Sequence, residues 1–155
     1  QVLLLHALPF GGDMWDATVA SLTAASNTPT SGSGPTFARS ASSGWSVHAP
    51  TLGQFGSSLS AWAEGALDSI GPEPVIVVGN SVGASCAFEI AHLAPDRVAG
   101  IVVIGGKAQV RPDPLLRDEA VTLLSRHGRG AGWDRYWRDL FGPNATPEVL
   151  AERKL

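Results

Sequence analysis

The sequence predicts an α/β fold in which a parallel β-sheet is flanked by helices. Four short runs of β-forming residues alternate with segments whose apolar residues recur every three or four positions. Alternation of this kind is typical of parallel sheets with right-handed crossovers. The third run, residues 75–78, is apolar at every position, as expected of a central strand that is covered on both faces.

The composition is that of a globular chain and gives no sign of a polyanionic partner; a small-molecule substrate is expected from the sequence motifs and not from the composition. Hydrophobic residues make up 44% and charged residues 16% of the 155 residues, which suits a packed core. The net charge is −3 and no basic run is present, so we expect neither nucleic acid nor a membrane surface as a partner. The single cysteine, Cys86, excludes an internal disulfide. Metal-ligand spacing is absent, so no metal or cofactor is expected.

No apolar stretch approaches the roughly 20 residues of a membrane span. The opening apolar run is too short for a secretory signal and has no basic residues before it, so we expect a cytoplasmic protein.

The first half of the chain begins with a predicted strand over residues 2–6. Asp13 is a candidate cap for the helix that follows it. Residues 26–44 are dominated by Ser, Thr, Gly and Pro, and are predicted to be a flexible insert. The second strand is predicted over residues 45–49.

The next segments continue the alternation. Ser57 or Ser58 can cap a helix with a 3.6-residue apolar stripe. The third strand is followed by a predicted helix over residues 83–93, which ends before Pro95. The fourth strand is predicted over residues 99–104.

From Pro112 onward the pattern becomes helical. Amphipathic helices are predicted at about residues 115–126 and 132–140, and a third after Pro147. We therefore predict an α/β core over residues 1–111, with the insert 26–44 inside it, and the beginning of a helical cap over residues 112–155.

The sharpest local signal lies between the third strand and its helix. Ser81 stands between Gly79 and Gly83 in the pattern G-x-S-x-G. A tight strand-to-helix turn strains its central residue and requires small neighbours two positions away on either side. It also exposes the serine hydroxyl, and directs the N–H of Val82 at the helix start toward the same space. This context predicts a nucleophile with one oxyanion-hole donor.

Three motifs together resemble the α/β-hydrolase fold family. They are Leu-Leu-Leu-His-Ala-Leu-Pro at residues 3–9, the Gly-Asn-Ser-Val-Gly turn at 79–83, and the helix-to-strand passage at 94–104. The resemblance covers nearly the whole chain except residues 26–44. It implies the strand order second, first, third, fourth, with ligands bound where the order reverses between the first and third strands.

Site roles follow from the resemblance position by position. Ser81 is implied as the nucleophile, and the N–H groups of Val82 and Leu8 as the oxyanion hole. Ala7 stands where the family usually has glycine. The family also has two strands before the first one here, and a catalytic acid and histidine after two further strands. None of these is found, so we expect an incomplete chain that is a poor catalyst alone and self-associates through its exposed sheet edges.

Other residues have competing interpretations. His6 is close enough to the turn to be proposed as the base, but a loop histidine that bonds the backbone is preferred, because the family places the base downstream of the nucleophile. Cys86 is interpreted as a packing residue. One helix face carries three aromatic residues that either line a substrate pocket or seat the cap on the core, namely Trp133, Tyr136 and Trp137.

The predicted function is a cofactor-free serine hydrolase acting on an ester, a lactone or a related carbonyl compound by acyl transfer. Relatives with a similar layout include 3-oxoadipate enol-lactonases and simple esterases, C–C bond hydrolases and cofactor-free haloperoxidases. The rival class is a non-catalytic α/β-hydrolase-like binding protein or pseudoenzyme.

Overall fold

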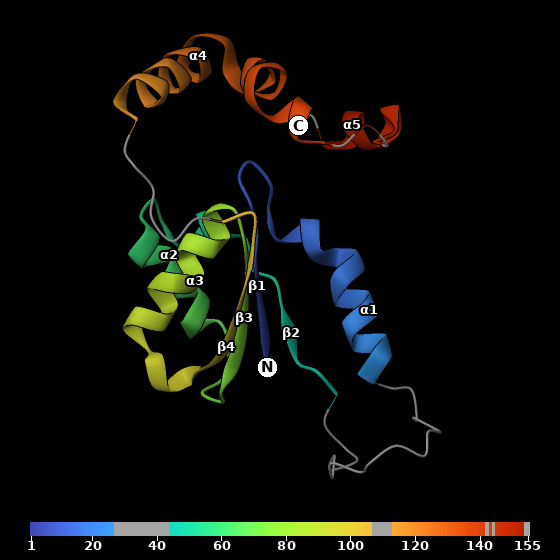
Figure 1. Ribbon diagram of the computed structural model, residues 1–155, viewed down its shortest axis with the longest axis vertical. Helices are drawn as coiled ribbons and strands as arrows, with labels where there is room; N and C mark the ends of the chain where they lie inside the picture. The colour runs from blue at the N-terminus through green and yellow to red at the C-terminus, as the bar shows by residue number, and fades with distance from the viewer. Residues whose placement is uncertain (27–43, 107–112, 142, 144, 154–155) are drawn as a thin grey trace. The chain divides into compact units, whose positions relative to one another are not determined.

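The computed structural model describes residues 1–26, 44–106, 113–141, 143 and 145–153. The chain divides into two compact units, Gln1–Gln109 and Val110–Leu155. The first unit contains the sheet and the second is helical (Figure 1). The predicted flexible insert falls almost wholly on residues 27–43, which lie outside the described residues.

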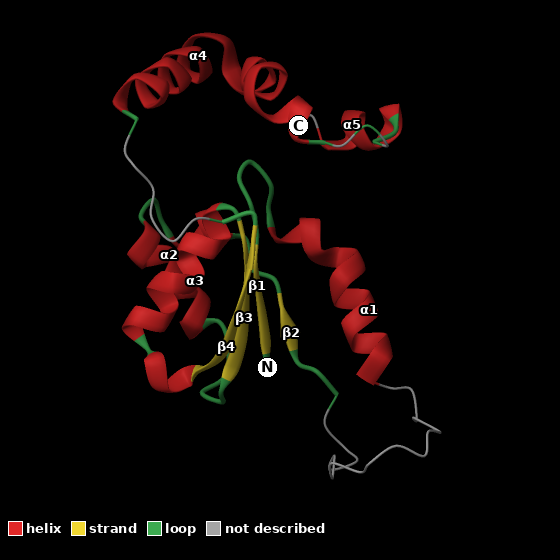
Figure 2. Cartoon of the chain, viewed as in Figure 1, coloured by secondary structure: helices red, strands yellow, loops and turns green. Residues whose placement is uncertain are grey.

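Four parallel strands form one sheet, drawn in yellow in Figure 2. Their order is β2-β1-β3-β4, so both the predicted fold class and the order expected from the family resemblance are confirmed. Because β1 pairs with β3, the strand order reverses there, and the carboxyl ends of these two strands lie side by side. The strands are β1 (Val2–Leu5), β2 (Val47–His48), β3 (Val75–Asn80) and β4 (Val98–Ile104).

Helices cover both faces of the sheet, with α1 on one side and α2 and α3 on the other (Figure 2). Alternate residues of β1 point to opposite faces, so Leu3 and Leu5 join the core beneath α2 and α3, whereas Val2 and Leu4 pack with Trp15 on the α1 side. All four residues of β1 are buried, as expected of an inner parallel strand. The helices are α1 (Asp16–Ser26), α2 (Leu59–Asp68) and α3 (Val82–Leu93).

Two predicted helix caps have different outcomes. Ser58 caps α2, because its hydroxyl accepts a hydrogen bond of 3.2 Å from the N–H of Ala61. The predicted cap at Asp13 is wrong, because Asp13 lies inside a 3₁₀ turn, Gly12–Trp15, that precedes α1. The N–H of Gly12, the first residue of this turn, donates to the Thr51 hydroxyl at 3.0 Å.

The second unit is less regular than the sequence predicts. Its first helix, α4 (Pro114–Gly132), is longer than expected and contains a kink at Gly128, where φ is 75°. The predicted helix over 132–140 is instead a π-helical turn, Trp133–Trp137, followed by a 3₁₀ turn, Arg138–Leu140. The five-residue spacing of the π turn brings the ring of Trp137 over Gly132, where an added Cβ would lie 2.8 Å from it. The last helix is α5 (Pro147–Arg153).

None of the helices in the described residues is at once long enough and apolar enough to cross a membrane.

The strand β4 forms one edge of the described sheet. Its last three side chains, Val102, Val103 and Ile104, are between 42% and 46% exposed. The strand has neither a charged residue nor a proline, the features by which natural edge strands avoid further pairing. We propose that this edge pairs with the same edge of a second copy of the chain.

This proposal predicts a concentration-dependent dimer or larger species in size-exclusion chromatography with light scattering. The variant Val103→Lys is expected to shift the chain toward monomer, because a charge at the edge must be desolvated on pairing. The control Leu115→Lys removes a side chain that is 83% exposed in the other unit, and should leave association unchanged. A monomeric wild-type chain throughout the concentration range would contradict the proposal.

Candidate active site

The turn between β3 and α3 holds Ser81 in a strained backbone conformation. Its φ is 54° and its ψ is −115°, and it alone among the described non-glycine residues has a positive φ. Such a conformation costs about 1–3 kcal/mol and persists only where surrounding structure enforces it. Here the N–H of Ser81 is held by the carbonyl of Ile104 at 2.9 Å, while the residue itself remains exposed.

The two glycines of the turn are required by close backbone contacts. A Cβ at Gly79 would lie 2.3 Å from the carbonyl oxygen of Gly83 and 2.5 Å from the Cα of Ala84. A Cβ at Gly83 would lie 2.3 Å from the carbonyl oxygen of Leu5 and 2.8 Å from that of His6. Neither position can therefore hold a side chain without movement of the backbone.

The same contacts place the end of β1 against the start of α3. Leu5 is paired with Gly79 in the sheet, and Gly83 packs on the carbonyl groups that follow β1. The loop that follows β1 contains Leu8, which is 50% exposed. The structure therefore places Leu8 and Val82 on segments that meet at the carboxyl ends of β1 and β3.

The start of α3 is a favourable place for negative charge. The helix is twelve residues long, and of the N–H groups in its first turn that of Ala84 donates to the carbonyl of Ser81 at 3.0 Å. The N–H groups of Val82 and Gly83 precede the first hydrogen bond of the helix. The aligned peptide dipoles add a partial positive charge at this end. Among the described residues, no imidazole or carboxylate forms a hydrogen bond with the hydroxyl of Ser81. The arrangement thus presents a serine beside a helix end that favours negative charge.

His6 is bonded to the backbone, as the preferred interpretation of this residue predicts. It is only 1% exposed. Its Nε2 accepts a hydrogen bond from the N–H of Leu52 at 2.8 Å, and its Nδ1 lies 3.0 Å from the carbonyl oxygen of Ala7. Both ring nitrogens are hydrogen-bonded to backbone groups in the protein interior. His6 is therefore not available to take a proton from Ser81.

Cys86, on the same helix as the turn, lies in the core and is fully buried. Burial, reinforced by the nearby Glu89 carboxylate, raises the pKa of its thiol to about 12. The thiol is therefore protonated at neutral pH, which fits the packing role and not a nucleophilic one.

The three aromatic residues proposed to line a pocket lie in the second unit, and two of them pack within it. Trp133 is buried, and its ring centroid is 5.2 Å from that of Phe141. The ring of Trp137 covers Gly132, whereas half-buried Tyr136 has the guanidinium of Arg135 5.4 Å from its ring centroid. Their contribution to a substrate pocket stays a prediction.

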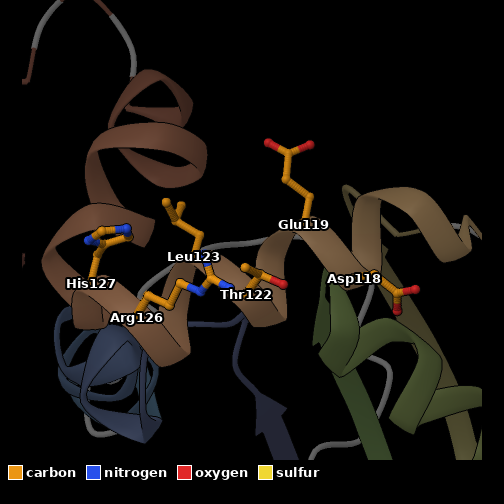
Figure 3. A pocket seen from close by; sticks show the side chains of 6 residues that line it. All are labelled: Asp118, Glu119, Thr122, Leu123, Arg126 and His127. Carbon is orange, nitrogen blue, oxygen red and sulfur yellow. The ribbon is translucent and has the colours of Figure 1, made fainter.

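A pocket that the sequence patterns do not predict lies on one face of α4. It has a volume of about 420 Å³. Its lining mixes acidic, basic and apolar side chains, and it is open to solvent (Figure 3). No group of three or more His, Cys, Asp or Glu residues in the described ranges could hold a metal ion, here or elsewhere. The lining residues are Asp118, Glu119, Thr122, Leu123, Arg126 and His127.

The site thus has a strained serine between two crowded glycines, at the carboxyl end of a central parallel strand. Residues 1–149 match the α/β hydrolase fold family, and the chain belongs to that family. No curated protein sequence matches the chain.

Among solved structures, the chain is similar to a thermophilic esterase from Thermogutta terrifontis that was determined with malate bound. The TM-score is 0.66 and the sequence identity is 22% over 99% of this chain. The match covers 56% of the esterase, so the chain spans little more than half its length.

Proposed function

We propose that the protein carrying this chain is a serine hydrolase that cleaves an ester, a lactone or a related carbonyl compound by acyl transfer, with Ser81 as the nucleophile. The observation that carries the proposal is the conformation of Ser81. A serine needs no positive φ and no pair of crowded glycines to serve as an ordinary turn residue. A nucleophile does need them, because the turn lifts its hydroxyl clear of the sheet and beside a helix N-terminus.

The chemistry assigns distinct tasks to the groups of the site. The Ser81 oxygen attacks the substrate carbonyl while a general base takes its proton, and the carbonyl oxygen becomes an oxyanion. We assign the N–H groups of Val82 and Leu8 to that oxyanion, because they lie on the two segments that meet beside the serine. The leaving alcohol takes the proton from the base, and water then hydrolyses the acyl-serine by the same steps.

An ester is the substrate class that the likeness to a thermophilic esterase supports. The general base is not assigned to any residue, since none of the described residues contacts the Ser81 hydroxyl as a base. A lactone fits the same chemistry, because the only difference is that the leaving alcohol stays attached to the acyl group.

Replacement of Ser81 tests the proposal, because acyl transfer through this hydroxyl must stop when the hydroxyl is removed. The protein should be expressed with any sequence that flanks residues 1–155 in its gene. A non-catalytic binding protein, the rival class, predicts no ester turnover above the uncatalysed rate for the wild type.

A further inference from the structure

We propose that His6 is a positioning residue which fixes the orientation of the peptide group between Ala7 and Leu8, and thereby aims the N–H of Leu8 at the oxyanion. This inference rests on the proposed function, because it concerns how one oxyanion donor is held. Among the described residues, His6 is the one polar residue that is almost completely buried, at 1% exposure.

The hydrogen bonds of the ring determine its tautomer. The N–H of Leu52 can only donate, so Nε2 of His6 accepts and carries no proton. In the neutral ring the proton is then on Nδ1, which donates to the carbonyl oxygen of Ala7 at 3.0 Å. One ring therefore connects the loop after β1 with the 3₁₀ turn that begins at Leu52.

The carbonyl oxygen of Ala7 belongs to the same planar group as the N–H of Leu8. That oxygen receives a second hydrogen bond, from the N–H of Phe10 at 3.0 Å. The Ala7–Leu8 bond is trans, so the N–H of Leu8 points to the side opposite the oxygen. Two donors that hold the oxygen thus set the direction of the N–H, which must be fixed in advance if it is to stabilise an oxyanion.

Further contacts hold both ends of this loop. The N–H of Ala7 donates to the sulfur of Met14 at 3.3 Å. At the far end, the N–H of Gly12 donates to the Thr51 hydroxyl, next to Leu52. The loop is therefore bonded to the segment after β2 at both His6 and Gly12. These two contacts fix the position of the imidazole relative to Ala7.

Two near-isosteric variants separate positioning from a purely structural role. In His6→Asn the side-chain amide can replace Nδ1 as the donor to Ala7, whereas in His6→Gln the side-chain oxygen can replace Nε2 as the acceptor from Leu52. We expect His6→Gln to lower kcat for a nitrophenyl ester about 10- to 100-fold with little change in KM, less than the loss of a whole oxyanion donor. His6→Asn should keep kcat within about fivefold of the wild type, since it retains the hydrogen bond that orients the donor.

The outcomes are distinguishable from those that test the proposed function. If Ser81→Ala abolishes turnover but both His6 variants keep the wild-type kcat, or if kcat follows their thermal stability alone, positioning by His6 is overturned while the nucleophile stands. A second measurement uses the unmodified protein: nitrogen NMR of the imidazole should show a protonated Nδ1 and an unprotonated Nε2 for His6. The opposite tautomer would remove the donor to Ala7 and overturn the inference.

Discussion

Ser81→Ala is expected to abolish ester hydrolysis by the protein that carries this chain. Loss of the serine or histidine of a catalytic triad lowers turnover by about 10⁶-fold, because the remaining groups cannot form the covalent intermediate. The oxyanion donors and the binding site remain, so a residual rate above the uncatalysed reaction is expected. Initial rates with a nitrophenyl ester series measure both quantities.

The matched control is Ser57→Ala, which removes the same hydroxyl from an exposed position before α2. It should leave kcat and KM unchanged. Alanine at position 81 must also adopt the positive φ of this turn, so circular dichroism should confirm that the variant is folded before its rate is interpreted. Turnover within tenfold of the wild type in a folded Ser81→Ala variant would exclude Ser81 as the nucleophile.

The second large effect is expected for Gly83→Ala. The added methyl group would lie 2.3 Å from the carbonyl oxygen of Leu5 and 2.8 Å from that of His6, and both are backbone atoms that cannot rotate away. Such overpacking should lower the free energy of unfolding by about 3 kcal/mol, measured by urea denaturation. It should also displace the end of β1 and with it the loop of Leu8, so activity should fall more than stability alone explains.

Gly100→Ala is the matched control for this substitution. Gly100 lies in β4, and among the described residues other than Gly100 and its two chain neighbours no atom lies within 4 Å of the position that a Cβ would take. Its substitution should leave stability unchanged or raise it by less than about 1 kcal/mol, because alanine reduces the freedom of the unfolded chain. Equal effects of the two substitutions would show that the close approach of α3 to β1 is not a constraint in solution.

Much of the first unit was predictable because its signals are local. Hydrophobic periodicity identifies β1, β3, α2 and α3, and the hydroxyl that caps α2 is recognisable in the sequence. Periodicity says nothing about strand order, which followed instead from the resemblance carried by three motifs. The β2 strand shows the limit of local reasoning, because a strand is predicted over residues 45–49 but only Val47 and His48 pair with β1.

The second unit was less predictable for a physical reason. A helical period describes regular helices, whereas Trp133–Trp137 forms a π turn in which the Trp137 ring packs on Gly132. The positions of Gly128 and Gly132 were visible in the sequence. What periodicity does not give is that the chain kinks at Gly128 and that Gly132 then packs against Leu124 and Trp137.

At the candidate site, the sequence indicated Ser81 because its strain and its glycine neighbours are properties of one short segment. The role of His6 was only partly predictable. A backbone-bonded histidine was expected, but its partner Leu52 is 46 positions away, and the tautomer follows only from that contact. A general base is equally hard to predict from the sequence, because the fold brings it next to the nucleophile from a distant position in the chain.

The most direct test of the central claim is covalent labelling by a fluorophosphonate, followed by mass spectrometry of proteolytic peptides. The reagent forms a bond only with a serine whose hydroxyl is activated by a base and whose neighbouring N–H groups stabilise the phosphoryl oxygen. Our account predicts one phosphonyl group per chain, on Ser81, and none in Ser81→Ala. Labelling of another residue, or an unlabelled wild-type protein that hydrolyses esters, would contradict it.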